Sequence, residues 1–384
     1  MIDILVGGDI CPINRNLPLF QAGDASGIFH DLLEYFQRAD ISLVNLECPL
    51  IEVESPIEKC GPVLGVSSDC VKGIKAAGID IVNLANNHIL DHSAEGLGNT
   101  MRVCEASGIR TFGAGKDINA AREIVVVEVK GKRIGFLGMA EHEFSISTVG
   151  CWGANPLDLI DYVRNLRERK NDYDYLIVLV HGGKEYYPYP TPRLMETCRF
   201  LVEMGADAVI CQHSHCPVCF ETYKGSHIVY GQGNLIFDRY PVPTDTWYKG
   251  FLVKLTISGE KDSTLAIIPY IQSDSQAGAR RMNSEEEMEF LKAIEKRSNE
   301  ILVKDFVQER WLEYCRLERN YYLSAVLMPN RVLSRLNRKG SIIKFFYKRK
   351  FFFRMRAFIE CETHREVIST ILNDEINLTP KSRE

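Results

Sequence analysis

Acidic, amide and imidazole side chains in this sequence recur directly after short apolar runs. These residue types can bind a divalent metal ion or transfer a proton. The residues that follow such runs are Asp9, Glu47, Asn87, His88, His181 and His213, with Asp91 and His215 close behind. In open α/β sheets, ligands bind at the carboxyl edge of the strands, so we expect these side chains to share one site. Two cations bridged by a carboxylate need about this set of ligands.

Taken one at a time, these residues also have structural interpretations that the sequence leaves open. Asp9 follows two glycines and could be a turn residue, and the run Asn86-Asn87-His88 could cap the next helix. His181 alone could be a buried core histidine. We interpret them as one metal site because they fall together on a single predicted sheet edge.

Cysteines offer a competing site. Cys211, Cys216 and Cys219 surround two histidines and could hold a structural zinc, but such a site normally draws on a second knuckle that we do not find. A thioredoxin-like role needs a strand-to-helix context, whereas the C-x-x-C pair here enters a predicted strand. Two further histidines are candidates for the substrate pocket: His92, which could line it, and His142, which could contact substrate.

The elements that must position these residues follow from hydrophobic periodicity. Buried strands are predicted over 2–6, 41–46, 79–85, 175–180 and 208–211, and helices over 28–36, 68–77, 94–107, 157–169 and 192–204. Lys-Gly turns predict hairpins over 124–139 and 218–230, and two more strands are predicted over 251–257 and 265–270. The pattern indicates a mixed α/β domain over residues 1–272.

The composition shifts after residue 272. Residues 272–281 are polar and indicate a linker, and helical spacing follows over 284–299, 303–317, 321–336 and 342–370. We therefore expect a helical C-terminal region over residues 273–384.

Cations and aromatic residues are interleaved in the segment 331–356, which contains no acidic residue. The cations are Arg331, Arg335, Arg338, Lys339, Lys344, Lys348, Arg349, Lys350, Arg354 and Arg356, and the aromatic residues are Phe345, Phe346, Tyr347, Phe351, Phe352 and Phe353. This pattern fits a peripheral membrane contact or a surface for an anionic partner. It also fits a helix whose aromatic side chains pack on the main domain while its cations are solvated.

Composition excludes several classes of protein. Of the 384 residues, 45% are hydrophobic and 25% charged, which excludes a disordered chain, a collagen and a small disulfide scaffold. A net charge of -5 argues against a nucleic-acid binder that works by overall charge. We find neither a signal-like N-terminus nor an apolar run of the roughly 18 residues that a membrane span needs. We therefore expect reduced cysteines and a cytoplasmic protein, peripheral at most at the inner membrane face.

Six short motifs in a fixed order carry a resemblance to a known family. They are Gly8-Asp9, Asn45-Leu46-Glu47, Asn86-Asn87-His88-Ile89-Leu90-Asp91, His181-Gly182-Gly183-Lys184-Glu185, His213-Ser214-His215 and Gly231-Gln232-Gly233-Asn234. Together they resemble the capsule-synthesis CapA family, also called the poly-gamma-glutamate biosynthesis family, which is similar to the calcineurin-like metallophosphoesterases. The resemblance covers residues 1–272. It implies a four-layer α-β-β-α sandwich, with a helical C-terminal extension outside it, and a pair of divalent metals such as Mn, Fe or Zn.

The resemblance also implies a role for each matching residue. Asp9 and His215 would hold one metal, Glu47 would bridge, and Asn87, His181 and His213 would hold the second. His88 would protonate the leaving oxygen, and Asp91 would orient His88. The substrate pocket would include Glu185, Gly233 and Asn234. Cys11 stands where related phosphoesterases carry a histidine, so a thiolate ligand is a further possibility at that position.

Three functions remain open at this point. The ligand set favours a metal-dependent phosphoesterase for capsule or surface-polymer synthesis, acting on an anionic or polymer-precursor substrate. The departure at Cys11 and the basic C-terminal region favour a non-catalytic accessory subunit of a polymer synthase or export complex. The same metals could also support hydrolysis or transfer at amide bonds. In each case the partners would be the capsule-synthesis machinery, with no nucleic acid.

Overall fold

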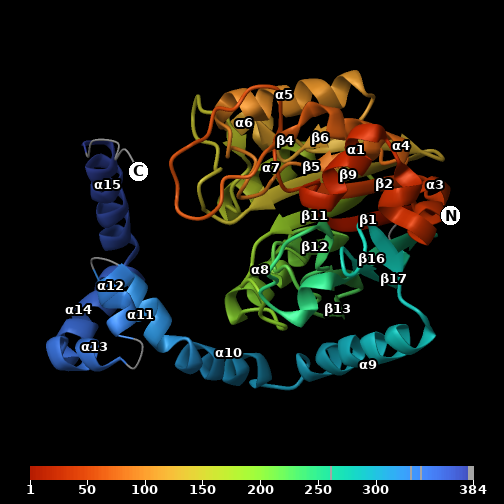
Figure 1. Cartoon of the computed structure of the whole chain (residues 1–384). Helices are drawn as coiled ribbons and strands as arrows, with labels where there is room; N and C mark the ends of the chain where they lie inside the picture. Colours follow the sequence, from red (N-terminus) through yellow and green to blue (C-terminus); the bar gives the residue numbers. More distant parts are fainter. Residues whose placement is uncertain (260–261, 329–330, 338–339, 379–384) are drawn as a thin grey trace. The chain divides into compact units, whose positions relative to one another are not determined.

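The computed structural model describes residues 1–259, 262–328, 331–337 and 340–378 (Figure 1). These residues form two compact units, Met1–Gln308 and Glu309–Glu384. The domain boundaries that we predicted, 1–272 and 273–384, remain a prediction.

The larger sheet of the first unit is built around its N-terminal strand. Strand β1 (Ile2–Cys11) pairs in parallel with β2 (Ile41–Leu46) and β15 (Asn234–Phe237), and β5 (Ile81–Asn83) and β6 (Arg110–Phe112) extend the parallel side beyond β2. On its other side, β16 (Lys249–Ile257), β17 (Ser263–Gln272) and β18 (Ala279–Arg281) are antiparallel. The parallel strand ends of this sheet therefore come from segments far apart in the sequence.

The second sheet has the order β13-β14-β12-β11-β9-β8. Its parallel centre consists of β9 (Lys132–Ala140), β11 (Tyr175–His181), β12 (Ala208–Gln212) and β14 (Ser226–Val229). The edge strands β8 (Val125–Val129) and β13 (Phe220–Tyr223) close antiparallel hairpins with their neighbours. Both hairpins predicted from the Lys-Gly turns are confirmed.

Alternation along the strands divides the core into three layers. Ile4 and Val6 of β1 join Ile177 and Leu179 of β11 in one buried cluster, so the two sheets face each other. Leu5 of β1 points to the opposite face of its sheet, into a cluster shared with helices, and Val178 of β11 does the same on the other sheet. The sheets are therefore the two inner layers of the unit.

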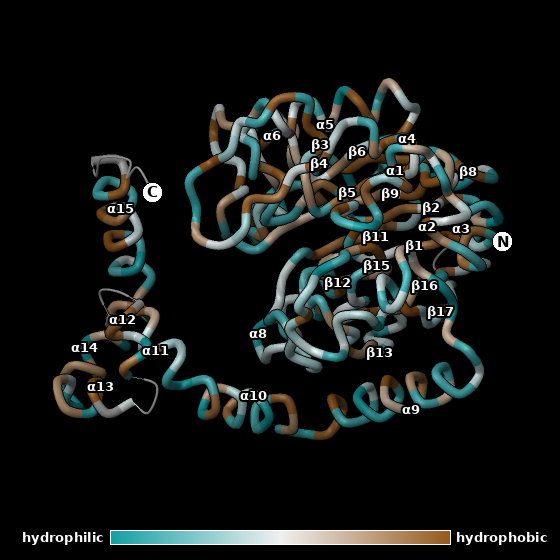
Figure 2. Tube along the Cα trace, viewed as in Figure 1, coloured by the Kyte–Doolittle hydropathy of each residue, from teal (hydrophilic) through white to brown (hydrophobic). Residues whose placement is uncertain are grey.

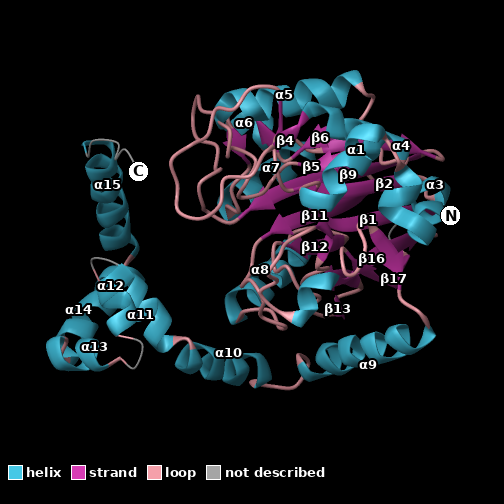
Figure 3. Cartoon of the chain, viewed as in Figure 1, coloured by secondary structure: helices cyan, strands magenta, loops and turns pink. Residues whose placement is uncertain are grey.

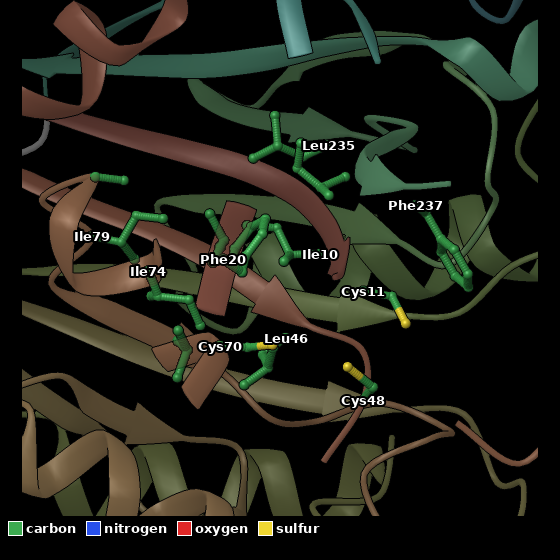
Figure 4. Packing of buried hydrophobic residues seen from close by; sticks show 14 of the residues in the cluster. Ile10, Cys11, Phe20, Leu46, Cys48, Cys70, Ile74, Ile79, Leu235 and Phe237 are labelled. Atoms are coloured by element: carbon green, nitrogen blue, oxygen red, sulfur yellow. The ribbon is translucent and has the colours of Figure 1, made fainter. Parts of the chain in front are cut away.

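Helices cover both outer faces. The helices on the larger sheet are α1 (Leu17–Ala22), α2 (Ala25–Phe29), α3 (Leu33–Arg38), α4 (Val71–Ala76) and α5 (Ser93–Ala106). Figure 4 shows part of their packing, in which Phe20 and Ile74 meet Ile10 and Leu46. On the second sheet lie α7 (Leu159–Arg169) and α8 (Pro192–Glu203). The four-layer α-β-β-α sandwich is thereby confirmed (Figure 3).

Minor elements complete the first unit. Two small sheets pair β3 (Leu50–Ile51) with β4 (Val66–Ser67) and β7 (Ala114–Gly115) with β10 (Gly153–Ala154), and α6 (Ile118–Ala121) is a single turn. Helix α9 (Ser284–Glu300) is mostly hydrophilic (Figure 2), yet its Phe290 and Ile294 belong to the cluster between the sheets. An apolar pair four residues apart places one helix face on the sandwich.

The second unit is helical. Helix α10 (Phe306–Leu317) leads into α11 (Arg319–Leu327), α12 (Arg331–Leu336), α13 (Ser341–Phe346), α14 (Arg349–Glu360) and α15 (Glu362–Leu378). The predicted helix over 342–370 is therefore three helices. Of the predicted basic segment, Arg338, Lys339 and the side chain of Arg331 lie outside the described residues. Among the helices that the structure describes, none is long and apolar enough to cross a membrane.

Candidate metal centre

The polar residues singled out from the sequence come from the ends of four parallel strands. Glu47 follows β2 directly, His181 is the last residue of β11, and His213 follows β12. Asp9 lies inside β1, which continues to Cys11, so the prediction that this strand stops at the glycines is wrong. The register of β1 shifts on both sides of Asp9, and this bulge interrupts the regular alternation of side chains there.

Packing requires a glycine at position 8. A Cβ placed on Gly8 would collide with the carbonyl oxygen of Gly233, just before β15. Gly8 therefore permits a close approach of two backbones beside Asp9, whereas Gly233 itself has a left-handed φ of 80°. The sequence singled out both glycines, and the structure gives them complementary roles.

Potential metal ligands gather in groups that share members. Glu47, His181 and His213 form one group, and Asp9, Glu47 and His215 form another. Within each group the candidate ligand atoms lie within 4.8 Å of one another. Glu185 forms a third group with His213 and His215. Because Glu47 belongs to the first two groups, its carboxylate is placed to bridge two positions.

The carboxylate of Glu47 is the least compensated group in the site. Its side chain is fully buried, and neither oxygen accepts a hydrogen bond from any part of the chain that the structure describes. Burial raises the pKa of Glu47. Burial, together with the nearby Glu47, also raises the pKa of Asp9 to about 7. Two buried carboxylates side by side are costly unless a cation compensates them.

The side chains of His181, His213 and Asn87 also converge on one point. The Nε2 of His181 lies 3.1 Å from the Nδ1 of His213 and 3.1 Å from the Oδ1 of Asn87. Burial holds the pKa of both histidines well below the ordinary value. Lone pairs of neutral imidazoles and an amide oxygen that converge in this manner suit a divalent transition metal.

Neighbouring amides orient the ligands. Asn45 Nδ2 donates to Asp9 Oδ1 at 2.8 Å, and the side-chain oxygen Oδ1 of Asn45 accepts from the amides of Asn83 and Asn86. The Nδ1 of His215 lies 2.8 Å from Asn234 Oδ1, a bond in which His215 donates and which leaves Nε2 available as a ligand. Such outer bonds fix the tautomer and direction of a metal-binding side chain.

Three residues of the site have a strained backbone. His213 and His215 have φ values of 89° and 51°, and Tyr186, whose ring stacks on His215, has 60°. Non-glycine residues with positive φ are sparsely populated and cluster at functional sites. The i, i+2 spacing of the two histidines reaches a common centre through this left-handed loop.

His88 is bound to a carboxylate that is itself fully engaged. Its Nδ1 lies 2.6 Å from Asp91 Oδ2, and the Leu64 backbone N–H donates to the same oxygen at 2.7 Å. Asp91 Oδ1 accepts from Lys59 Nζ at 2.5 Å. The predicted pairing of His88 with Asp91 is present, and Lys59 joins it without having been noticed in the sequence.

Three predicted site residues lie apart from the ligand groups: the pocket candidates His92 and His142, and the possible metal ligand Cys11. His92 Nδ1 accepts a hydrogen bond from the Ser55 backbone at 3.0 Å, and His142 is exposed. Cys11 belongs to none of the ligand groups formed by the described residues, and burial next to the Cys48 thiol raises its pKa well above the ordinary value. A thiolate ligand at Cys11 therefore has no support in the geometry.

Sequence reasoning also missed residues that the site uses. Asn45 was quoted only as part of a motif, although it holds Asp9. Glu143 Oε2 accepts from Asn87 at 3.0 Å, and its other oxygen lies 3.8 Å from His213 Nε2. Asn45 is a polar residue inside the otherwise mostly apolar strand predicted over 41–46, a signal that could have identified it. Lys59 and Glu143 are in loops and carry no such signal.

Comparison with known proteins identifies relatives of this architecture. A family model described as "Bacterial capsule synthesis protein PGA_cap" matches residues 3–239. The "Capsule biosynthesis protein CapA" of Bacillus anthracis is 30% identical over 221 residues, which cover 55% of this chain and 54% of the relative. A "Probable polyglutamine synthesis accessory protein" of Mycobacterium tuberculosis is 29% identical over 213 residues, covering 52% and 56%. This chain thus spans just over half the length of these relatives.

Among solved structures, one described as a novel phosphatase from Mycoplasma pneumoniae superposes with a TM-score of 0.46 at 14% identity. The superposition covers 71% of this chain and 95% of the phosphatase.

Proposed function

The chain belongs to the bacterial capsule synthesis family PGA_cap, and we propose that it is a metal-dependent hydrolase of the phosphoesterase type that serves capsule or surface-polymer synthesis. The observation that carries this proposal is the buried Glu47 carboxylate without a hydrogen-bond partner among the described residues, at the point where two ligand groups overlap. The nitrogens nearest to it are His181 Nε2 and His215 Nε2, at 3.4 and 3.8 Å from Oε1, and a metal cation held among these three side chains would compensate the carboxylate charge.

The residues fit two metals. Asp9, Glu47 and His215 would hold the first, and Glu47, His181 and His213 would hold the second with the Asn87 oxygen. Mn, Fe and Zn all accept this mixture of imidazole and carboxylate ligands. Bound metals of this kind polarise a phosphoryl oxygen and lower the pKa of bound water. Asn45 and Asn234 would keep the ligands in place.

Proton transfer to the leaving oxygen would come from His88. Its Nδ1 is engaged with Asp91, so its Nε2 is the nitrogen available to substrate. Burial raises the pKa of Glu47, and the nearby His215 and His88 oppose that rise, which supports a position for the His88 imidazole beside the metal ligands. A positioned general acid is typically worth about 100- to 10,000-fold in rate.

Hydrolysis assays test the proposal. The protein loaded with manganese or zinc should hydrolyse a phosphodiester such as bis(4-nitrophenyl) phosphate, and His88→Ala should lose turnover while retaining metal. Activity on gamma-linked glutamyl peptides in place of phosphodiesters would favour amide chemistry. If ligand variants such as His213→Ala still support capsule formation in cells, the catalytic proposal is wrong and an accessory role stands, as in the name of the mycobacterial relative.

We further propose that the basic C-terminal segment contacts an anionic membrane surface, which would place the protein at the inner face of the cell membrane. Phe345 and Phe346 are 70% and 68% exposed, and Arg349 lies over the ring of Phe353 at 5.2 Å. Exposed aromatic rings among cations match the chemistry of a lipid interface. The wild type should float with phosphatidylglycerol vesicles, and the double variant Phe345→Ser, Phe346→Ser should not. Equal flotation of both proteins would contradict this contact.

A further inference from the structure

A loop that carries no motif lies against the His88–Asp91 pair. It covers residues 52–65, between β3 and β4, and most of its side chains are exposed. Its Lys59 is the exception, because the Lys59 side chain is only 2% exposed. Lysine is rarely buried unless its charge is paired.

The backbone of the loop is attached at several points. Ser55 N–H donates to His92 Nδ1 at 3.0 Å, and Ile57 N–H donates to the Asp91 carbonyl at 3.0 Å. Leu64 N–H donates to the Asp91 carboxylate. These bonds hold the loop without help from a buried cation, so anchoring alone does not account for the placement of Lys59.

The ammonium of Lys59 lies beside the His88–Asp91 pair and donates to Asp91. Its Nζ lies 2.5 Å from Asp91 Oδ1, 3.2 Å from His88 Nδ1 and 5.3 Å from the centre of the Phe144 ring. The other carboxylate oxygen accepts from His88 and from the Leu64 backbone. With donors on both oxygens, the carboxylate of Asp91 has one orientation, and this orientation sets the plane of the His88 imidazole.

We propose that Lys59 is a positioning residue for proton transfer by His88, a role that rests on the proposed function. In phosphodiester hydrolysis, the water oxygen bonds to phosphorus and one water proton passes to solvent. The bond from phosphorus to the leaving oxygen breaks, and His88 Nε2 gives its proton to that oxygen. Lys59 touches neither phosphorus nor the leaving oxygen and acts through Asp91.

Leaving-group dependence separates this role from a structural one. Methyl 4-nitrophenyl phosphate releases a weakly basic oxygen that needs little protonation, whereas methyl phenyl phosphate releases a more basic one. Loss of positioning therefore slows the phenyl ester more. We expect Lys59→Met to lower kcat about 100-fold on the phenyl ester and less than about 5-fold on the nitrophenyl ester, with little change in KM.

The variants and controls are matched. His88→Ala should show the same dependence on the leaving group, and Lys59→Arg, which keeps the charge, should recover part of the loss. Glu58→Gln, on an exposed neighbour in the same loop, should behave as the wild type. Metal content and melting temperature are measured on every variant. If Lys59→Met does not fold, Lys59→Gln and Lys59→Arg carry the comparison.

Each outcome decides one point. Selective loss on the phenyl ester supports the positioning role. Equal losses on both esters would make Lys59 a loop anchor and overturn it, as would unchanged rates. A metal-loaded wild type that hydrolyses neither ester overturns the proposed phosphoesterase function, and the role of Lys59 with it.

Discussion

Without metal, Glu47→Gln should be more stable than the wild type. Added metal should stabilise the variant less than it stabilises the wild type. In the absence of metal, the buried Glu47 carboxyl accepts no hydrogen bond within the described part of the chain. An unsatisfied buried polar group costs about 1–3 kcal/mol, and more if it is charged. Glutamine has nearly the same shape and no charge, so metal-free Glu47→Gln should gain about 1–2 kcal/mol, or roughly 2–6 °C in melting temperature.

With metal bound, the wild type should be the more stable of the two proteins. At about 100 times its Kd, a ligand that binds only the folded state adds about 2.7 kcal/mol to stability. Glu47 belongs to two ligand groups, so its replacement weakens both and removes most of this gain. Thermal melts with chelator and with added manganese measure all four states. Glu105→Gln, on the exposed surface of α5, is the control.

The result that would refute this reasoning is specific. If metal-free Glu47→Gln melts below the metal-free wild type and both proteins gain equally from metal, then Glu47 is not the bridging ligand. Its burial would then need a different compensating group.

Two further predictions follow from contacts around the sandwich. Asn45→Leu removes the donor to Asp9 and should weaken metal affinity about 10- to 100-fold, as measured by titration with manganese; unchanged affinity in the folded variant would contradict the orienting role. Arg199→Met leaves the buried Glu221 carboxylate without its two guanidinium bonds of 2.9 and 2.7 Å and should cost about 3 kcal/mol in chemical unfolding, whereas Arg193→Met, on the exposed side of the same helix, should cost less than about 0.5 kcal/mol. Similar costs for the two arginine variants would contradict this account of the buried pair.

Strands β2, β11 and β12 could be predicted because each is a mostly apolar run in which every residue is buried. This is why Glu47, His181 and His213 fall at strand ends as expected. Asp9 does not lie at the end of its strand, because β1 contains a bulge and continues through the glycines. Gly8, next to this bulge, packs against the backbone of Gly233, a close approach that no local pattern encodes.

Helix boundaries were harder to predict from the sequence. The predicted helix over 28–36 is broken at His30, which has a φ of 42°. His30 Nε2 lies 3.2 Å from the carbonyl oxygen of Ala277, so a distant segment fixes this break. In the C-terminal unit, Tyr347 and Cys361 have extended backbone and separate helices that periodicity had joined.

Lys59 shows the limit most clearly. A lysine in a polar loop is solvated in most proteins, and only the tertiary structure shows that its side chain reaches Asp91. The sequence identified the residues that follow strong local patterns. It did not identify Asn45, Lys59 or Glu143 as residues that contact them, because these partners are remote in the chain.

Metal content tests the central claim most directly. Purified protein incubated with manganese or zinc and then desalted should carry about two metal equivalents by mass spectrometry, and His213→Ala should carry fewer. His364→Ala, in the exposed helix α15, should match the wild type. A wild type that retains no metal, or equal metal in the wild type and His213→Ala, would contradict a metal centre built on Glu47.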